Sequence, residues 1–164
     1  LPDRPITRFE LLKIVLFASC TPVEEAEDSL IQSYTDLFSL YDVTAPPDAN
    51  QRKRVITAAI LYNIATGYDD NTFRSDNLTN RAEAIAILLR TMGIDVLSSN
   101  TPVPFTDVDG EAWYFPYLQE AINQEVIQGY QDGTVRMGQP ITRAEASKLV
   151  YKLLVEKEGL NYAQ

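Results

Sequence analysis

Three arginines recur in one short motif, and a guanidinium group in such a place can bind a carboxylate. In this motif an arginine follows Thr or Asn and precedes a glutamate by two positions; its arginines are Arg8, Arg81 and Arg143. Each lies in the first turn of an expected helix, where the helix dipole disfavours a positive charge. We therefore expect each guanidinium to have a partner, either a carboxylate of the protein or an anionic ligand that accepts two parallel hydrogen bonds.

The composition excludes most other kinds of chemistry. The 164 residues include 14 Lys and Arg, 23 Asp and Glu and no His, so the net charge is −9. Without His there is no imidazole base, no Ser-His-Asp triad and no His-ligated metal. The single cysteine, Cys20, cannot form an internal disulfide or a Cys-rich metal cluster. Nucleic-acid binding requires a basic face, so the acidic balance argues against a nucleic-acid partner.

Carboxylates alone could still act as catalysts or hold calcium. Asp107, Asp109 and Asp132 are the candidates for a carboxylate pair of the kind that hydrolyses glycosides. Asp107 and Asp109 also resemble the start of a calcium loop, but the twelfth position holds Leu118 instead of a bidentate glutamate. Turn formation explains the same acidic residues. We therefore predict no enzyme, no cofactor and no metal site.

The sequence predicts no membrane-spanning segment. Its longest apolar run, Ile14–Ala18, is far shorter than the roughly 20 residues of a spanning helix. Small residues precede Cys20, as at a bacterial lipoprotein cleavage site, but Asp3 and Glu10 stand where a signal peptide carries positive charge. Because Pro22 follows, we expect a helix end at Cys20 rather than lipidation.

An internal repeat organises the chain. The segment Gly67–Arg74 matches Gly129–Arg136 at an interval of 62 positions, and the arginine motifs of these two copies keep the same interval. A third copy opens the chain, where Pro5–Glu10 matches Pro140–Glu145. The front half of this first copy is missing. Since the chain also begins with Leu1 rather than Met, we expect a fragment or a processed product.

The two longer copies also match ahead of their turns. Tyr34–Leu37 pairs with Phe105–Val108, but the middle copy carries nine more residues before its Gly-Tyr turn, which we place in a loop near 42–50. The predicted division is the second helix of a truncated first repeat plus an acidic helix (1–33), a second repeat (34–100), a third repeat (101–158) and a tail (159–164).

Local signals predict an all-α fold of helix-turn-helix repeats. The second helix of each copy starts at a capping box, and apolar residues follow at helical spacing. We assign the glutamates of these boxes a structural role. The boxes are Thr7-x-x-Glu10, Asn80-x-x-Glu83 and Thr142-x-x-Glu145. The first helices are expected at about 48–66 and 112–128, each ending before a glycine, and the acidic helix at about 24–31.

The third copy resembles the S-layer homology (SLH) repeat of bacterial surface proteins. The resemblance rests on the order of Phe105-Thr106-Asp107-Val108, Trp113, Gly129-Tyr130-x-Asp132-Gly133-Thr134 and Thr142-Arg143-Ala144-Glu145. The second copy matches in its Gly-Tyr and Arg-Ala-Glu blocks, and the first copy only in its second helix.

This resemblance implies both an architecture and a function. The three repeats would pack as a pseudo-three-fold bundle with grooves between neighbours, and the module would be extracellular, non-catalytic and cell-wall associated. It would anchor a surface protein by binding secondary cell-wall polysaccharide, often pyruvylated, through arginine, tryptophan and turn backbone. By position, the ligand-binding residues would be Arg8, Arg81, Arg143, Trp113, Gly67, Asp70, Gly129, Asp132 and Gly133.

The implied chemistry is physically consistent. The carboxylate of a pyruvate ketal suits the planar fork of arginine, an indole offers a flat face to a sugar, and glycine lets the backbone approach closely. A net charge of −9 opposes an anionic polymer at long range, so recognition is expected to be local.

Departures from the family pattern leave alternatives open. Gln51 stands near the place of Trp113 in the middle copy, Asn71 replaces the turn glycine, and a bulky Phe9 replaces alanine in the first copy. Trp113 alone would fit a core anchor. Because the first copy is incomplete, one groove is expected to be incomplete or completed by another chain. The alternative function is a structural module whose repeats mediate protein–protein packing or self-association in a surface layer or filament.

Overall fold

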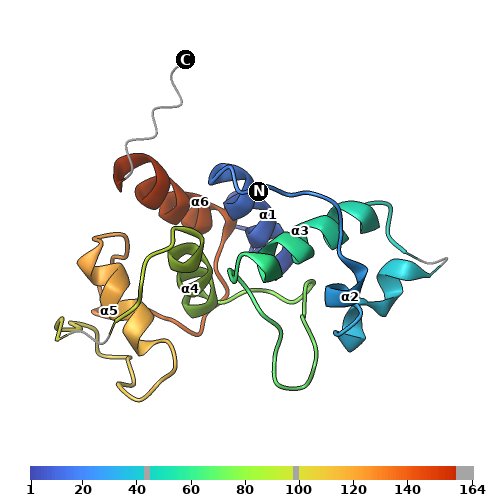
Figure 1. Cartoon of the computed structure of the whole chain (residues 1–164). Helices are drawn as coiled ribbons and strands as arrows, with labels where there is room; N and C mark the ends of the chain where they lie inside the picture. The colour runs from blue at the N-terminus through green and yellow to red at the C-terminus, as the bar shows by residue number, and fades with distance from the viewer. Residues whose placement is uncertain (43–44, 98–99, 158–164) are drawn as a thin grey trace. The chain divides into compact units, whose positions relative to one another are not determined.

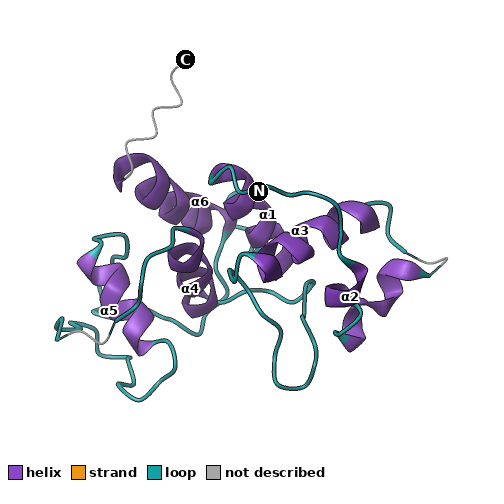
Figure 2. Cartoon of the chain, in the orientation of Figure 1, coloured by secondary structure: helices purple, strands orange, loops and turns teal. Residues whose placement is uncertain are grey.

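The structure is a computed structural model that describes residues 1–42, 45–97 and 100–157 (Figure 1). The expected tail at 159–164 and part of the expected loop near 42–50 lie outside these residues. Within the described part, the chain is helical, with two isolated bridges and no strand (Figure 2). The all-α fold class is confirmed, whereas the pseudo-three-fold bundle stays a prediction. The helices are α1 (Arg8–Ala18), α2 (Asp28–Ile31), η1 (Thr35–Tyr41), α3 (Ala49–Leu61), α4 (Arg81–Thr91), α5 (Phe115–Asn123), α6 (Arg143–Tyr151) and η2 (Lys152–Lys157).

The chain divides into two compact units. The N-terminal unit is Thr7–Asn77, and the C-terminal unit combines Leu1–Ile6 with Leu78–Gln164. In the N-terminal unit α3 contacts α1, α2 and η1, and in the C-terminal unit α4 contacts both α5 and α6 (Figure 1). Residues 1–6 belong to the C-terminal unit because their backbone bonds to it, for example through the Ile6 N–H and the Ile141 carbonyl, 3.1 Å apart.

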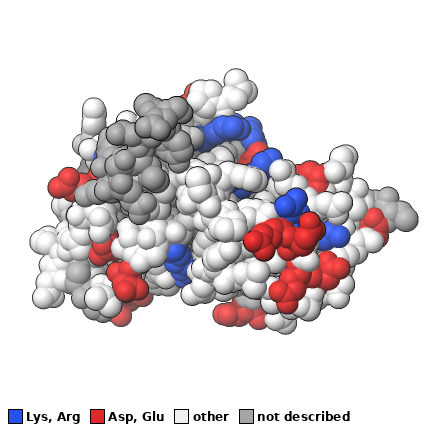
Figure 3. Space-filling model, turned by 45° about the horizontal axis from the view of Figure 1, so that its top comes forward, with Lys and Arg blue, Asp and Glu red and all other residues white. Residues whose placement is uncertain are grey.

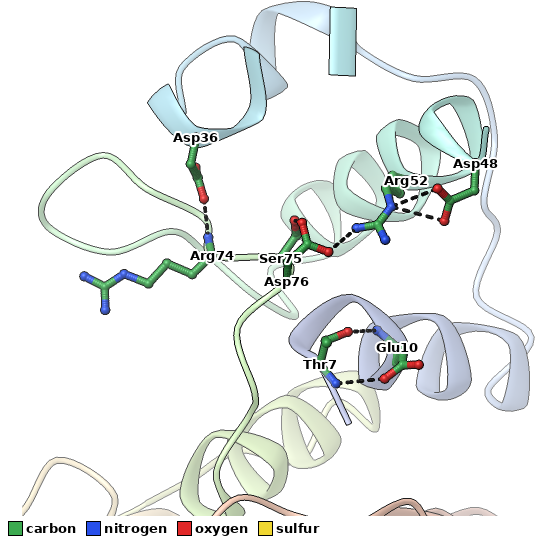
Figure 4. A network of polar contacts seen from close by, with 8 residues as sticks. All are labelled: Thr7, Glu10, Asp36, Asp48, Arg52, Arg74, Ser75 and Asp76. Carbon is green, nitrogen blue, oxygen red and sulfur yellow. Dashed lines mark hydrogen bonds and ion pairs between the residues drawn. The ribbon is translucent and has the colours of Figure 1, made fainter. Parts of the chain in front are cut away.

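All three predicted capping boxes are present. At the start of α1 the Thr7 hydroxyl accepts a hydrogen bond from the Glu10 N–H at 3.2 Å, and the Glu10 carboxylate accepts one from the Thr7 N–H at 2.9 Å (Figure 4). Both halves of the box also form at Asn80 before α4 and at Thr142 before α6. Each box satisfies two backbone N–H groups that a helix start leaves without partners.

The first helices of the two longer copies are shorter than expected. Helix α3 ends at Leu61 and α5 at Asn123, each six positions before the glycine predicted to follow its last residue. In both copies a residue in the left-handed region stops the helix, Asn63 with φ 54° and Glu125 with φ 57°. The next N–H then bonds back to a carbonyl inside the helix, as from Ile64 to Ala59 at 2.8 Å. Cys20 (φ 54°) occupies the same kind of position after α1, which confirms the predicted helix end.

The expected acidic helix is confined to α2, a single turn. The residues before it are not helical, and their backbone groups form hydrogen bonds with α3. The Arg54 guanidinium donates to the carbonyls of Val23 and Glu24 at 2.8 and 2.7 Å, and the Glu27 N–H donates to the Thr57 hydroxyl at 3.1 Å. Tertiary hydrogen bonds thus replace the helical ones that the local composition favoured.

Each unit buries its own apolar side chains. The core of the N-terminal unit includes Leu11, Leu12, Leu16, Ile31, Leu37, Ile56 and Phe73, and that of the C-terminal unit includes Ile85, Leu88, Leu118, Ala121, Val135 and Ile141. Among the described helices, none has both the length and the apolar character needed to cross a membrane.

Candidate ligand-binding site

The two Gly-Tyr turns, Gly67–Arg74 and Gly129–Arg136, are each anchored by an aspartate that lies well before them in the chain. The Asp36 carboxylate accepts hydrogen bonds from the N–H groups of Phe73 and Arg74 at 2.8 and 2.7 Å, the second of which Figure 4 draws. Asp107 does the same for Val135 and Arg136, both at 2.8 Å. Because both oxygens of Asp107 accept backbone hydrogen bonds, its place in the sequence is explained by folding of the turn.

A second aspartate, which lies within each turn, forms hydrogen bonds and an ion pair with other residues of that turn. The Asp132 carboxylate accepts hydrogen bonds from the N–H and hydroxyl of Thr134 at 3.0 and 2.6 Å and pairs with Arg136 at 2.7 Å. The Arg136 guanidinium in turn lies 4.0 Å from the centre of the Tyr130 ring. Hydrogen bonds from Thr134 and Arg136 lower the pKa of Asp132 to about 2. The first turn repeats this arrangement at Asp70, whose pKa is also lowered to about 2.

These two carboxylates make the stability of the turns sensitive to acid. A pKa lowered in the folded state from 3.8 to about 2 stabilises the fold above pH 3.8, and this contribution is lost as the pH falls through about 2. We expect Asp132→Asn to lose less unfolding free energy than the parent chain between pH 4 and pH 2. Urea unfolding at stepped pH checks this, with Asp95→Asn as the control that removes one negative charge outside the turns. Equal pH slopes for the parent and Asp132→Asn would contradict it.

Arg81 is buried against the turn of the third copy, with 6% of the residue exposed. Its Nε donates to the Val135 carbonyl at 3.0 Å and its Nη1 to the Glu145 carboxylate at 2.9 Å. Its guanidinium lies 5.3 Å from the centre of the Tyr130 ring, and the Tyr130 hydroxyl donates to the same Glu145 oxygen at 2.8 Å. Of the two partners expected for this arginine, the structure supplies the protein carboxylate.

The electrostatic state of Glu145 follows from these contacts. Burial by itself would raise the pKa of Glu145, but hydrogen bonds from Thr142 and Tyr130 and the charge of Arg81 outweigh it. The pKa of Glu145 is therefore below its usual value, and the carboxylate stays ionised opposite Arg81. Burial, followed by the hydrogen bond to Glu145, raises the pKa of the Tyr130 hydroxyl.

Arg8 contacts the turn of the second copy in the same way, through a backbone carbonyl and a tyrosine ring. It is buried, donates to the Thr66 carbonyl at 2.7 Å, and lies 5.2 Å from the ring centres of both Tyr68 and Phe73. Its neighbour Phe9 is also buried, and the centre of the Phe9 ring lies 4.4 Å from the Cζ atom of the Arg52 guanidinium. Arg52 in turn forms ion pairs with Asp48 and Asp76 (Figure 4). The bulky Phe9 thus fills space inside the N-terminal unit.

A cavity of about 190 Å³ lies beside the Arg81 network in the C-terminal unit. Its lining includes Arg81, Gly129, Tyr130, Glu145, Lys148 and Lys152. Three cationic groups thus surround one carboxylate in a chain whose net charge is −9. On the face that Figure 3 draws, the described Lys and Arg side chains form small separate groups rather than one broad basic surface. The Arg81 cavity is therefore a local concentration of positive charge.

Trp113 lies at a different place in the same unit. The residue is 57% exposed and contacts Tyr114 and Tyr117 edge-on, with ring centres 5.9 and 6.1 Å apart. The Tyr117 hydroxyl accepts a hydrogen bond from Arg90 at 2.7 Å. Trp113 is a surface residue rather than a core anchor, and it is not among the described residues that line the Arg81 cavity. Gln51, which stands near its place in the middle copy, accepts a hydrogen bond from Lys13 at 2.8 Å.

The repeat geometry agrees with a comparison to protein families. The model of the S-layer homology domain matches residues 47–85 and 104–147, which together are half of the chain. The chain belongs to the S-layer homology family.

Relatives of this S-layer homology chain include bacterial proteins named for the cell surface, the surface layer and cellulosome anchoring. It is 33% identical over 94 residues to cell surface glycoprotein 1 of Acetivibrio thermocellus, covering 57% of this chain and 4% of that protein. It is 35% identical over 95 residues to the cellulosome-anchoring protein of the same organism, an alignment that covers 57% of this chain and 21% of that protein. It is 27% identical over 123 residues to the surface layer protein of Brevibacillus choshinensis, an alignment that covers 71% of this chain and 11% of that protein. The chain thus spans about a fifth or less of these relatives.

Family membership and these relatives support an extracellular, cell-wall-associated location and a role in cell-wall anchoring. They point to a non-enzymatic module.

The expected ligand residues of this S-layer homology chain fall into separate groups. Arg81 and Gly129 meet at one cavity, and Trp113 lies apart from it. The turns are stabilised by Asp70 and Asp132 and by Gly133, which has a positive φ of 79°. The Tyr34 ring packs against the backbone of Gly67. Arg8 is enclosed in the N-terminal unit, and Arg143 is exposed.

Of the described residues that line the cavity, only Arg81 and Gly129 were predicted as ligand contacts; the others include Tyr130, Glu145, Lys148 and Lys152. The lysines follow Glu145 by three and seven positions, which places them on one face of a helix. That spacing was the available signal for them.

Proposed function

We propose that this chain anchors its protein to the bacterial cell wall by binding an acidic secondary cell-wall polysaccharide at the Arg81 cavity. The observation that carries the proposal is the gathering of Arg81, Lys148 and Lys152 around the single carboxylate of Glu145. At about 190 Å³ the cavity is smaller than pockets that enclose drug-sized ligands. It therefore suits one acidic substituent, such as the carboxylate of a pyruvate ketal, rather than a long stretch of polymer.

The groups around the cavity have distinct roles in this proposal. Arg81 is held by Glu145 and the Val135 carbonyl, so it supplies a fixed charge without ordering on binding. Lys148 is exposed, and Lys152 is half-buried with its ammonium donating to the Glu125 carbonyl at 3.2 Å. An ammonium group has three N–H donors, so Lys152 keeps two of them for a bound carboxylate. Because the pKa of Glu145 is lowered, this carboxylate remains charged, and a ligand anion is expected on the lysine side of the cavity.

Trp113 would provide a second contact for the same polymer. An exposed indole offers an apolar face to the C–H groups of a sugar and an N–H donor at its edge. A polysaccharide is long enough to touch separate places on a surface, so the cavity and the Trp113 face need not be adjacent. Binding to two places raises the overall affinity beyond that of either one.

Binding to isolated wall polysaccharide tests the cavity directly. We expect Lys148→Gln combined with Lys152→Gln to weaken binding about tenfold, the factor that corresponds to about 1.4 kcal/mol. Both lysines face solvent enough for glutamine to be tolerated. The measurement is co-sedimentation with purified wall polysaccharide over a range of protein concentrations. Trp113→Ala in the same assay reports on the second contact.

A matched control separates the cavity from general charge. Lys13→Gln combined with Lys53→Gln removes the same two charges outside the cavity lining and is expected to bind like the parent chain. Equal binding by the Lys148/Lys152 variant and the parent would reject the proposed site. Removal of the pyruvate ketals from the polysaccharide is expected to lower binding by the parent and to leave the Lys148/Lys152 variant little changed.

A further inference from the structure

The sequence contains two Asp-Gly dipeptides, Asp109-Gly110 and Asp132-Gly133, and no Asn-Gly dipeptide. In such a pair the glycine nitrogen can attack the aspartate Cγ atom, because glycine has no Cβ that restricts the backbone. The N–Cγ bond forms, a Cγ–O bond of the protonated carboxyl group breaks, and the oxygen leaves as water. Water then opens the cyclic succinimide at either carbonyl carbon. One product is aspartate again, and the other is isoaspartate, in which the main chain runs through Cγ.

The two dipeptides are alike in solvent access and in the direction of the carboxyl group. Both aspartates are exposed. The Asp109 Oδ1 atom accepts a hydrogen bond from the Glu111 N–H at 3.0 Å, and the Asp132 Oδ1 atom accepts one from the Thr134 N–H, also at 3.0 Å. Each bond spans the intervening glycine, so both carboxyl groups are folded back toward the residue whose nitrogen would attack. Neither feature distinguishes the two aspartates.

The two glycines differ in how firmly the backbone holds them. The Gly133 N–H donates to the Tyr130 carbonyl at 3.0 Å, and the Gly133 carbonyl accepts a hydrogen bond from the Thr106 N–H at 3.0 Å. Gly110, by contrast, is exposed and forms no backbone hydrogen bond with any residue that the structure describes. Its nitrogen can turn toward Cγ without the loss of a hydrogen bond, whereas Gly133 must first open locally.

The carboxyl group of Asp132 is also the poorer target. It accepts a hydrogen bond from the Thr134 hydroxyl at 2.6 Å and pairs with Arg136 at 2.7 Å, and these contacts lower the pKa of Asp132 to about 2. The group is therefore ionised at neutral pH, and a carboxylate releases its oxygen less readily than a carboxylic acid. Among the described residues, the Asp109 carboxylate accepts one hydrogen bond, from the Glu111 N–H, and forms no ion pair.

We propose that Asp109 is a site of spontaneous isomerisation to isoaspartate and that the fold protects Asp132 from the same reaction. The Asp109 carbonyl accepts a hydrogen bond from the Ala112 N–H at 3.2 Å, while its carboxylate binds the Glu111 N–H. In isoaspartate these two groups exchange places in the chain and the backbone gains one CH2 group, so both hydrogen bonds change. This turn leads into Trp113, the single tryptophan of the chain, and the modification therefore changes the surroundings of the indole.

Ageing of the folded chain at pH 6 measures both reactions in one molecule. Isoaspartate has the mass of aspartate, so the peptides of a digest are separated by chromatography and identified by electron-transfer fragmentation. We expect isoaspartate to accumulate at Asp109 at least about tenfold faster than at Asp132, because reaction at Asp132 requires local opening. In guanidinium chloride, where the hydrogen bonds of both turns are lost, the two rates are expected to become similar.

Gly110→Ala is the matched variant. A Cβ at this position would have no described heavy atom within 4 Å apart from those of Gly110 and its two chain neighbours, so the fold accepts alanine. We expect it to slow the reaction at Asp109 about tenfold and to leave the rate at Asp132 unchanged. The isolated isoaspartate form is expected to differ from the fresh chain in Trp113 fluorescence.

Three results would overturn this proposal. The first is equal rates at Asp109 and Asp132 in the folded chain. The second is a faster rate at Asp109 that persists in guanidinium chloride, because the difference would then belong to the neighbouring residues rather than to the fold. The third is an isoaspartate form with unchanged Trp113 fluorescence, which would remove the assigned effect on the turn.

Discussion

Replacing Gly129 by alanine is expected to destabilise the C-terminal unit by about 3 kcal/mol, an over-packing cost at the upper end of the usual range. A Cβ atom at Gly129 would lie 2.3 Å from a carbon of the Phe105 ring and 2.8 Å from the Thr134 carbonyl oxygen. The ring cannot move away freely, because Asp107, two residues on, is bonded to the N–H groups of Val135 and Arg136. Relief of the clash would therefore break the anchor of the turn.

Gly67 offers the same test in the N-terminal unit. A Cβ there would lie 2.0 Å from a carbon of the Tyr34 ring and 2.7 Å from the Thr72 carbonyl oxygen. The Gly67 N–H also donates to the Tyr34 hydroxyl at 3.2 Å, so a shift of the ring would cost a hydrogen bond as well. Gly67→Ala is expected to match the effect of Gly129→Ala, but in the other unit.

Urea unfolding combined with amide hydrogen exchange measures these effects unit by unit, since two units need not unfold as one. Gly138→Ala is the matched control, because a Cβ at that position would have no described heavy atom within 4 Å apart from those of Gly138 and its two chain neighbours. It is expected to change the unfolding free energy by less than about 0.5 kcal/mol. If Gly129→Ala behaves like Gly138→Ala, the turn is less tightly packed than described.

Repeat spacing predicted the elements that recur and missed those fixed by a single backbone angle. The capping boxes were predictable because each is a local pair of side chains three positions apart, as at Thr142 and Glu145. The ends of α3 and α5 were not, because Asn63 and Glu125 adopt a left-handed conformation that is more typical of glycine. The non-helical segment before α2 could not be predicted either, since its hydrogen bonds go to α3, which is distant in the sequence.

The candidate site was predictable only in part, for a related reason. The position of Arg81 in a first turn predicted that it needs a carboxylate, yet Glu145 is 64 positions away in the chain. Only the fold decides whether a protein group or a ligand fills that need. Lys148 and Lys152 became candidates once the Gly129 turn was placed beside them. Trp113 was singled out from the pattern of the third copy, while its separation from the cavity required coordinates.

Arg81→Met is expected to destabilise the C-terminal unit by about 3 kcal/mol or more, as the removal of one partner from a buried ion pair usually does. The side chain of Arg81 is 8% exposed and that of Glu145 30%. The variant would leave Glu145 ionised without its cationic partner and the Val135 carbonyl without the Arg81 donor. Methionine fills a similar volume, so the loss reports on polar contacts more than on a cavity.

Arg143→Met is the matched control within the same chain, because it changes the same residue type at the same place in the repeat. Its side chain is exposed and forms no hydrogen bond or ion pair with the described residues, and its loss is expected to cost less than about 0.5 kcal/mol. Urea unfolding at pH 7 measures both variants. Equal effects of the two substitutions would mean that the Arg81–Glu145 pair contributes nothing specific.

The double variant Arg81→Met with Glu145→Gln isolates the pair from its surroundings. If the cost of Arg81→Met comes from the uncompensated carboxylate, neutralising Glu145 should recover about 1 kcal/mol or more of coupling energy. The deficit of Arg81→Met should also shrink in acid. Because the folded-state pKa of Glu145 is lowered partly by Arg81, the parent chain loses this stabilisation as the pH falls through that pKa, and the variant has less of it to lose. A deficit that is constant with pH and unrelieved by Glu145→Gln would assign the effect to packing of the guanidinium on Tyr130 instead.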